Sequence, residues 1–237
     1  MLAGGIAHDF NNLLVGVIGN AGLALEATPP DSPLRARLEA IQQAGERAAD
    51  LVRQLLAYSG KGRFVIEPVN ISDLIRETVR LIEASVQNAV LVLDLQASAS
   101  IHADASQIQQ LIMNLVINAA EAIGESDGTV TVRTRERDLA GPPEESGLQT
   151  PPAGSGLQAL KPGRYVEIVV EDTGSGVDEP TRERIFDPFF TTKFTGRGLG
   201  LAAALGIVRG HKGYIEVQSE PGKGSRFSVL FPVSAER

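Results

Sequence analysis

The chain has 237 residues, of which 43% are hydrophobic and 22% charged, a composition typical of one large or two modest globular domains. The net charge of -7 argues against a general nucleic-acid-binding protein, because phosphate contacts require clustered Lys and Arg. Without cysteine, the chain forms no disulfide and no thiolate metal site. No apolar run approaches the roughly 20 residues that span a bilayer, and no signal peptide is evident. We therefore expect a cytoplasmic chain, unless a preceding part of a longer protein anchors it to a membrane.

The N-terminal quarter of the chain has the pattern of two amphipathic helices. Apolar residues recur every three or four positions as far as Ala27, where the stretch TPPDSP at residues 28–33 ends the pattern. Ser32 and Pro33 then make a favourable start for a second helix with the same spacing. Two helices alone bury little surface, so we expect residues 1–62 to form a hairpin that pairs with a second copy as a four-helix bundle. Packing of both helices onto the rest of the same chain is the alternative.

The remaining residues, 63–237, alternate between short strands and helices, which predicts an α/β sandwich with a mixed sheet packed on helices. The whole chain is therefore expected to be α+β. Strands are expected at residues 64–66, 90–95, 129–135, 165–171, 214–219 and 226–231, and helices at 71–84, 101–123, 179–186 and in the segment ending at 208. The segment 139–163 is rich in Gly, Pro and Ser and lacks apolar periodicity, so we interpret it as a flexible insertion and not as a site.

The predicted helix within residues 101–123 carries a narrow polar stripe on an otherwise apolar surface. Asp104 is suited to cap its start, with Gln107 completing a capping box. At ~100° per residue, four polar side chains fall within about 40° of one line: Gln110, Asn114, Asn118 and Glu121. Asn has poor helix propensity, so mid-helix Asn114 and Asn118 need another explanation. Their amides either bond neighbouring backbone in the core or line a site for a hard cation such as Mg²⁺.

Two glycine-rich segments add to this stripe. The sequence DTGSG, beginning at Asp172, follows a strong strand and places a carboxylate beside backbone that a flat ligand can approach closely. The sequence GRGLGL, at residues 196–201, opens an apolar helix whose N-terminal amides favour phosphate oxygens. Each motif alone also occurs in ordinary tight turns. With the stripe, however, they supply an adenine acceptor, a magnesium ligand and a phosphate cradle.

In this combination the sequence resembles the sensor histidine kinases of two-component systems, with their Bergerat-type (GHKL) ATP-binding domain. The resemblance covers nearly the whole chain. The motifs that carry it are, in chain order, GGIAHDFNNLL at 4–14, NLVINAAEA at 114–122, DTGSG at 172–176, FDPFFTTK at 186–193, GRGLGL at 196–201 and GKGSRF at 222–227. The resemblance implies an ATP-dependent protein histidine autokinase that uses ATP and Mg²⁺ and passes the phosphoryl group to an aspartate on a response-regulator receiver domain.

The resemblance makes His8 the phosphate acceptor, with Asp9 orienting it or taking its proton. Helical geometry is consistent with this role, since His8 lies about 200° from Ile6 and the apolar seam and therefore faces outward. Neutral imidazole is a competent nucleophile near neutral pH, although an outward His is also commonly just solvated. Asn12, one turn further along, corresponds to the family position associated with dephosphorylating the regulator.

The resemblance also assigns the nucleotide site. Asp172 would accept the adenine amino group, Asn118 would bind Mg²⁺, and Lys193 would belong to a mobile lid over the nucleotide. Arg197 departs from the Thr or Ser that is frequent at its position. The expected nucleotide-binding residues are Asn114, Asn118, Glu121, Ala122, Asp172, Gly174, Gly176, Val177, Lys193, Gly196, Arg197, Gly198, Leu199, Gly200, Leu201 and Ser225.

Two other functions remain open at this point. One is an ATPase of the gyrase, chaperone and mismatch-repair kind, which shares the nucleotide fold but carries a water-activating Glu where this sequence has Asn114. An amide cannot act as that base, which favours phosphoryl transfer over hydrolysis. The other is a non-catalytic dimerisation module, although none of the motifs is visibly destroyed.

Overall fold

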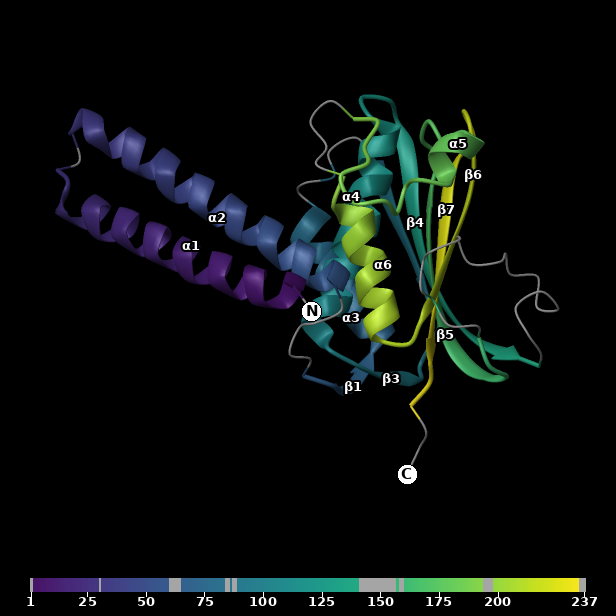
Figure 1. Ribbon diagram of the computed structural model, residues 1–237. Coiled ribbons are helices and arrows are strands. Elements are labelled where there is room, and N and C mark those ends of the chain that lie inside the picture. The colour runs from purple at the N-terminus through teal and green to yellow at the C-terminus, as the bar shows by residue number, and fades with distance from the viewer. Residues whose placement is uncertain are drawn as a thin grey trace. The chain divides into compact units, whose positions relative to one another are not determined.

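The computed structural model describes residues 2–29, 31–59, 65–83, 86, 89–140, 157, 160–193 and 198–234. In the two N-terminal helices, side chains are described for residues 13–29, 31–46, 48 and 49. The chain divides into two compact units, Met1–Gly62 and Arg63–Arg237. Figure 1 shows a helical hairpin for the first unit and a sheet with helices for the second. The predicted order, helices followed by an α/β domain, is confirmed.

The first unit is a hairpin of α1 (Leu2–Ala27) and α2 (Pro33–Ser59). The predicted start of α2 is confirmed, because Ser32 Oγ accepts a hydrogen bond from Leu34 N at 3.3 Å. The guanidinium of Arg35 donates to the carbonyls of Leu25 and Thr28, at 3.4 and 3.3 Å, and so satisfies the carbonyl end of α1. Among the described residues, no helix is both long and apolar enough to cross a membrane.

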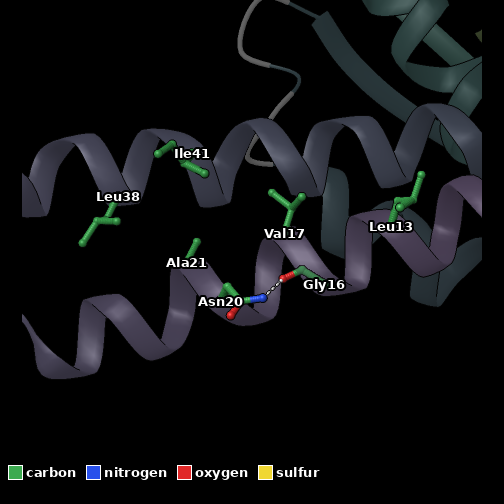
Figure 2. A pocket seen from close by; sticks show the side chains of 7 residues that line it. All are labelled: Leu13, Gly16, Val17, Asn20, Ala21, Leu38 and Ile41. Carbon is green, nitrogen blue, oxygen red and sulfur yellow. Dashed lines mark hydrogen bonds between the residues drawn. The ribbon is translucent and has the colours of Figure 1, made fainter.

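One face of the hairpin carries exposed apolar side chains. Leu13, Val17 and Ile41 are 68%, 47% and 48% exposed. They help to line a shallow pocket of about 440 Å³, whose complete lining is Leu13, Gly16, Val17, Asn20, Ala21, Leu38 and Ile41 (Figure 2). The hairpin unit by itself therefore leaves much of its apolar surface unburied.

The second unit is built on a five-stranded sheet with strand order β2-β4-β5-β7-β6. Strands β2 and β4 are parallel and the other neighbours are antiparallel, so the sheet is mixed, as predicted. The strands are β2 (Ala89–Leu95), β4 (Gly128–Leu139), β5 (Gly163–Asp172), β6 (Tyr214–Glu220) and β7 (Gly224–Pro232). Three longer helices cover one face of it (Figure 1): α3 (Ile71–Ile82), α4 (Ala105–Ile123) and α6 (Gly200–Gly210). The predicted helix at 179–186 is shorter, as α5 (Glu179–Arg182).

A small second sheet corrects the prediction for this part of the chain. Strand β1 runs over Glu67–Asn70, after Val65 and Ile66 of the predicted strand, while residue 64 lies outside the described residues. Strand β1 pairs antiparallel with β3 (Ser100–Ala103), which was not predicted from the sequence. Val65 and Ile66 are apolar but 71% and 51% exposed, so hydrophobicity placed the strand too early. The helix expected within residues 101–123 begins at Ala105, directly after its predicted cap Asp104, because the residues before that cap pair with β1.

The start of α4 confirms one half of the predicted cap and contradicts the other. Asp104 Oδ1 accepts from Ser106 N and Gln107 N, at 3.0 and 3.3 Å, as an N-cap does. A capping box would also direct the Gln107 side chain to Asp104 N–H. Instead, Asp104 N–H donates to Nε2 of His211 at 3.0 Å, and Gln107 Oε1 is buried without a hydrogen-bond partner. The His, 107 residues away, replaces the capping-box partner.

His211 ties the end of α6 to the start of α4. It is 6% exposed, and its Nδ1 lies 2.8 Å from the Ile207 carbonyl oxygen. With Nδ1 donating to that carbonyl and Nε2 accepting from Asp104, the ring is held as the neutral tautomer. Burial is the main influence that lowers the pKa of His211, opposed by the bond to Ile207 and by attraction to Asp104. Protonation would place a second donor against the Asp104 N–H.

We expect acid to weaken the fold through this residue. Because the folded pKa lies below the ordinary value of 6.5, the unfolded chain binds more protons between these two values. The free energy of unfolding should therefore fall as the pH drops through 6.5 towards the folded pKa. Urea unfolding between about pH 5 and 8 measures this slope, which should largely disappear in His211→Gln. His102→Gln, at an exposed position of β3, should keep it. An unchanged slope in His211→Gln would contradict the assignment.

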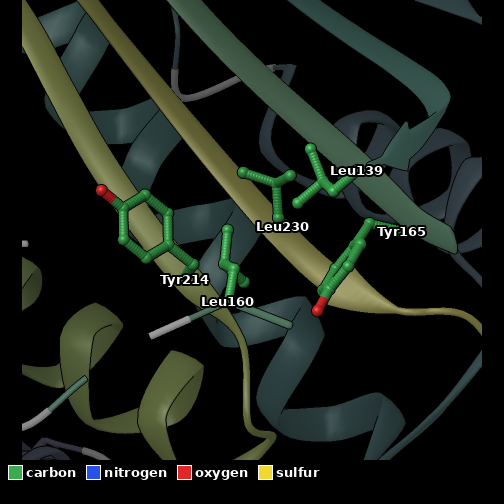
Figure 3. Packing of buried hydrophobic residues seen from close by; sticks show 5 residues of the cluster. All are labelled: Leu139, Leu160, Tyr165, Tyr214 and Leu230. Atoms are coloured by element: carbon green, nitrogen blue, oxygen red, sulfur yellow. The ribbon is translucent and has the colours of Figure 1, made fainter. Parts of the chain in front are cut away.

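The sheet face opposite the helices bears a second apolar cluster, which corrects the interpretation of segment 139–163. Leu160 is 7% exposed and packs with residues of β4, β5, β6 and β7 (Figure 3). Leu157 is packed against the same cluster. The buried members are Leu139, Leu160, Tyr165, Tyr214 and Leu230. Tyr165 Oη also donates to Lys161 O at 2.8 Å. The returning end of the insertion is thus part of the fold, while residues 141–156 and 158–159 lie outside the described residues.

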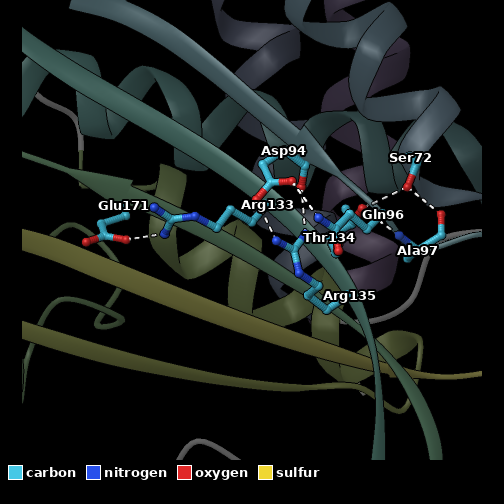
Figure 4. Close-up of polar contacts among 8 residues, drawn as sticks. All are labelled: Ser72, Asp94, Gln96, Ala97, Arg133, Thr134, Arg135 and Glu171. Atoms are coloured by element: carbon cyan, nitrogen blue, oxygen red, sulfur yellow. Dashed lines mark hydrogen bonds and ion pairs between the residues drawn. The ribbon is translucent and has the colours of Figure 1, made fainter.

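Ion pairs occupy another part of this face. Three arginines of β4, at alternate positions, each pair with an acid on a neighbouring strand, and two of these pairs are drawn in Figure 4. The pairs are Arg133 with Glu171, Arg135 with Asp94, and Arg137 with Glu167. On the helix side, Ser72 Oγ donates to Ala97 O at 2.6 Å and bonds Thr134 Oγ1 at 2.8 Å. The side chains in these ion pairs and hydrogen bonds thus have partners outside the segments DTGSG and GRGLGL.

Candidate active site

The polar stripe of α4 forms one wall of the candidate site. Asn114 and Asn118 are partly exposed, while Ile112, Val116 and Ala119 on the opposite side of the helix are at most 2% exposed. Asn114 Nδ2 donates to the carbonyl of Gly200 at 3.1 Å, which ties α4 to the first residue of α6. The Asn118 amide has no hydrogen bond to any described residue. One amide of the stripe therefore bonds backbone, whereas the other is open to a ligand.

Asp172 lies at the end of β5, where it is 4% exposed. Its Oδ1 accepts from Gly174 N at 2.8 Å. Burial raises the pKa of this carboxyl, opposed by the backbone hydrogen bonds from Gly174 and Ser225 and by the positive charge of Lys193. An ionised carboxylate has about four acceptor positions. Asp172 therefore retains acceptor capacity for a donor on a ligand.

Close backbone packing holds the turn after Asp172. A Cβ on Gly174 would lie 2.5 Å from the carbonyl oxygen of Ala122, and Ser175 N donates to that same oxygen at 2.9 Å. Gly176 has a φ of +61°, and a Cβ there would lie 2.0 Å from Glu220 O. Larger residues cannot occupy these positions without backbone movement. The C-terminal part of α4 and the Asp172 turn are thus fixed side by side.

A small hydroxyl network joins this turn to the end of β6 and the start of β7. Val177 N donates to Ser219 Oγ at 2.9 Å, and Ser219 Oγ donates to Gly224 O at 2.9 Å. Ser219 Oγ also lies 3.0 Å from Ser225 Oγ. Val177 and Ser225 were predicted from the sequence as site residues, but Ser219 was not, because its only local signal was a hydroxyl at the end of a strand.

The first turn of α6 has no side-chain cap among the described residues. Leu199 is the N-cap residue and makes no side-chain capping bond. Gly198 has a φ of +64°, and its carbonyl accepts from Phe189 N at 2.8 Å. The free N–H groups and the helix dipole at such an N-terminus favour anions. Gly200 and Leu201 therefore begin a helix that is suited to phosphate oxygens.

An ion pair crosses between two of the predicted motifs. Lys193 Nζ lies 2.6 Å from Glu121 Oε2, and the two side chains are 37% and 51% exposed. Glu121 follows Asn118 by one turn on α4, and Lys193 ends the FDPFFTTK stretch. Spacing in the sequence gave no indication of this contact.

The remaining predicted residues are only partly described. His8, Asp9 and Asn12 lie on α1, but their side chains fall outside the described residues. Gly196 and Arg197 also lie outside them. The structure therefore brings together residues from α4, the Asp172 turn, the Lys193 segment, the start of α6 and the loop between β6 and β7.

The residues present fit a magnesium ion that arrives with a nucleotide. Within the described ranges, no group of three His, Cys, Asp or Glu side chains is placed to hold a metal. Asn118 instead offers an amide that bonds to no described residue, and a Cβ added to Gly200 would lie 3.6 Å from its Nδ2. Mg²⁺ commonly takes one or two protein oxygens and completes its shell with phosphates and water. This donor set suits such a shared ion better than a metal held by protein alone.

Comparison with known proteins identifies the fold that carries this site. Residues 103–235, more than half of the chain, match the family described as Histidine kinase-, DNA gyrase B-, and HSP90-like ATPase. The chain belongs to this ATPase family. Residues 1–62 match the His Kinase A (phospho-acceptor) domain. The chain therefore combines the phosphoacceptor and ATPase domains of a two-component sensor histidine kinase.

Similar histidine kinases span both domains. Sensor kinase CckA of Brucella abortus is 36% identical over 98% of this chain and 24% of CckA. Sensor histidine kinase ZraS of Salmonella typhi is 31% identical over 100% of this chain and 46% of ZraS. The crystal structure of full-length ShkA in complex with AMPPNP has a TM-score of 0.73 and 25% identity, covering 99% of this chain and 46% of ShkA. The chain thus spans about a quarter to a half of the length of these three proteins.

Proposed function

We propose that the chain is an ATP-dependent protein histidine kinase that phosphorylates His8. The observation that carries the proposal is the buried Asp172 carboxylate, which shares one site with the open amide of Asn118 and the uncapped start of α6. Asp172 would accept the adenine amino group, Asn118 would bind Mg²⁺, and the amides of Gly198, Leu199 and Gly200 would bind phosphate. The bound ion would neutralise charge on the phosphates.

In the proposed reaction, a ring nitrogen of His8 attacks the γ-phosphorus of ATP. A nitrogen–phosphorus bond forms, the bond from the γ-phosphorus to the bridging oxygen breaks, and ADP leaves. Asp9 would orient the imidazole or take its proton. The phosphoryl group would then pass to an aspartate carboxylate of a response-regulator receiver domain, which regenerates His8. Asn12 would assist in removing phosphate from that regulator.

The contact of Asn114 supports phosphoryl transfer to a side chain over hydrolysis of ATP. In the ATPases with a gyrase-like site, a Glu at this position activates water. Here the Asn114 amide donates to the Gly200 carbonyl, and an amide has no basic group for a water proton. We therefore place a histidine kinase ahead of a simple ATPase.

We further propose that the hairpin pairs with a second copy. The support is the match of residues 1–62 to the phospho-acceptor domain and the exposed apolar side chains around the pocket of Figure 2. Pairing of two hairpins would bury Leu13, Val17 and Ile41, which the hairpin unit leaves exposed. The measurement is molar mass in solution by light scattering, where a value for one chain at micromolar concentration would contradict the dimer.

Incubation with γ-labelled ATP tests the proposed function directly. Label on histidine is lost in acid and retained in base, whereas label on serine or threonine behaves in the opposite way. We expect label that is labile in acid. Release of labelled inorganic phosphate without labelled protein would favour the ATPase instead.

Asn118→Asp tests the proposed magnesium ligand. The volume barely changes, so the domain should stay folded, but a carboxylate in place of an amide alters charge at the ion. We expect a shifted Mg²⁺ dependence and a rate of autophosphorylation reduced by at least about tenfold. Mutation of a residue that only supports a metal ligand commonly reduces metal affinity or activity by roughly 10- to 100-fold, and tenfold is the lower end of that range. Gln110→Glu, two turns earlier on the same stripe, is the matched control and should leave the magnesium titration unchanged. Equal titrations for Asn118→Asp and the wild type would leave Asn118 with a structural role.

A further inference from the structure

The ion pair between Glu121 and Lys193 contributes little to the stability of the fold. Its side chains are 37% and 51% exposed, for Lys193 and Glu121, and such pairs add little to stability because water screens them and two long side chains must be ordered. The Nζ–Oε2 distance is nevertheless only 2.6 Å, and the contact joins segments 72 residues apart. Removal of either charge should therefore leave the domain folded.

The pair lies beside the groups proposed to hold the nucleotide. Glu121 is three residues after Asn118 on α4, and so projects from the same stripe. Burial raises the pKa of Asp172, and the positive charge of Lys193 is among the influences that oppose this shift. The field of the ammonium thus extends to the proposed adenine acceptor. Lys193 brings a positive charge into the site, and in this structure its ammonium group is paired with the Glu121 carboxylate.

A nucleotide triphosphate would compete for that charge. The Lys ammonium has three donors and one positive charge, and a polyphosphate offers more acceptor oxygens and more negative charge than one carboxylate. If Lys193 turns to phosphate, the Glu121 carboxylate loses its partner. The free energy of that ion pair is therefore subtracted from the free energy of nucleotide binding.

We infer that Glu121 and the nucleotide phosphates compete for the Lys193 ammonium, so that Glu121 sets a lower nucleotide affinity than the site would otherwise have. This inference rests on the proposed ATP site. It makes Lys193 a phosphate contact and Glu121 a residue that acts through Lys193, not a ligand of nucleotide or metal. Its distinctive consequence is that removal of the Glu121 charge tightens nucleotide binding.

A double-mutant cycle on the full chain tests the competition. Calorimetric titration with AMPPNP and Mg²⁺ gives the dissociation constant of the wild type, Glu121→Gln, Lys193→Gln and the double variant. We expect Glu121→Gln to bind roughly two- to fivefold tighter, the range for an exposed ion pair. Lys193→Gln should bind roughly tenfold weaker, as loss of a charged hydrogen bond does. The double variant should have the same dissociation constant as Lys193→Gln, because without the Lys193 ammonium Glu121 has no group to compete for.

Two controls separate this effect from others. Glu125→Gln removes the same charge from the exposed turn after α4 and should not alter the dissociation constant. Adenosine has no phosphates, so its binding should be equal in the wild type and Glu121→Gln. Unchanged or weaker AMPPNP binding by Glu121→Gln would overturn the inference, as would a Glu121→Gln effect that persists with Lys193→Gln. If the wild type binds adenosine but not AMPPNP, the phosphate contact fails; if it binds neither, the proposed function fails as well.

Discussion

The variant His8→Gln is expected to take up no label from γ-labelled ATP while still binding ATP. Glutamine keeps a polar side chain of similar reach, but its amide is not a nucleophile, so no bond to phosphorus forms. The nucleotide site lies in the other unit of the chain, residues 63–237, and should be intact. The measurement pairs acid-labile labelling with calorimetric binding of ATP on the same preparation.

The matched control for this variant is His102→Gln. His102 is an exposed histidine of β3, so its loss removes an imidazole without touching the proposed acceptor. It should label like the wild type. Label of undiminished intensity in His8→Gln would place the acceptor elsewhere, whereas loss of ATP binding in that variant would point to misfolding.

Helical periodicity was the part of the fold that the sequence predicted best. Helices α1, α2, α3 and α4 all lie close to their expected ranges, because a face that must be buried imposes a repeat of three and four residues. The same reasoning predicted the polar stripe of α4. Asn114 and Asn118 fall on the partly exposed side of the helix, opposite Ile112 and Val116. Local chemistry was sufficient here, since the stripe is a property of one element.

The errors came from contacts between distant residues. Strand β1 is defined by pairing with β3, so the exposed apolar residues Val65 and Ile66 were a misleading signal. The capping box failed because His211 occupies the position that Gln107 would have taken. No spacing rule links Asp104 to a residue at the end of α6. A composition rich in Gly and Pro likewise concealed Leu160, which is buried only because other strands meet it.

In the candidate site, too, local motifs were predicted from the sequence and contacts between distant residues were not. The Asp172 turn and the start of α6 were recognisable as motifs, because glycine is required where a Cβ would lie 2.0 to 2.5 Å from backbone atoms. Ser219 carried no such signal, although its hydroxyl joins Val177 to the loop between β6 and β7. The contact between Glu121 and Lys193 was equally invisible. Motifs predict which backbone approaches a ligand, but the side-chain pairs around it depend on the assembled fold.

Asp172→Asn is expected to abolish most nucleotide binding while leaving the fold as stable as the wild type or more so. Burial raises the folded pKa of Asp172 above its ordinary value of 3.8, so the folded state at neutral pH carries a carboxylate that burial disfavours. As the pH rises through 3.8 and the folded pKa, ionisation therefore reduces the free energy of unfolding. The neutral amide of Asn removes this cost, so its melting temperature at pH 7 should equal or exceed that of the wild type, and the difference should shrink in acid.

ATP binding by Asp172→Asn should be weaker than that of the wild type, although the stability of the fold is not reduced. The amide can still accept from Gly174 N–H, but it has one oxygen, and its NH₂ group would face the Ser225 N–H or the adenine amino group, donor against donor. A buried donor without an acceptor weakens ATP binding by roughly 10²-fold or more. Glu171→Gln is the matched control, because it removes the same charge from the preceding residue, which pairs with Arg133 on the other face of the sheet. It should bind ATP normally. Equal ATP affinity for Asp172→Asn and the wild type would exclude Asp172 as the adenine acceptor, and a large fall in melting temperature would show that the carboxylate serves the fold.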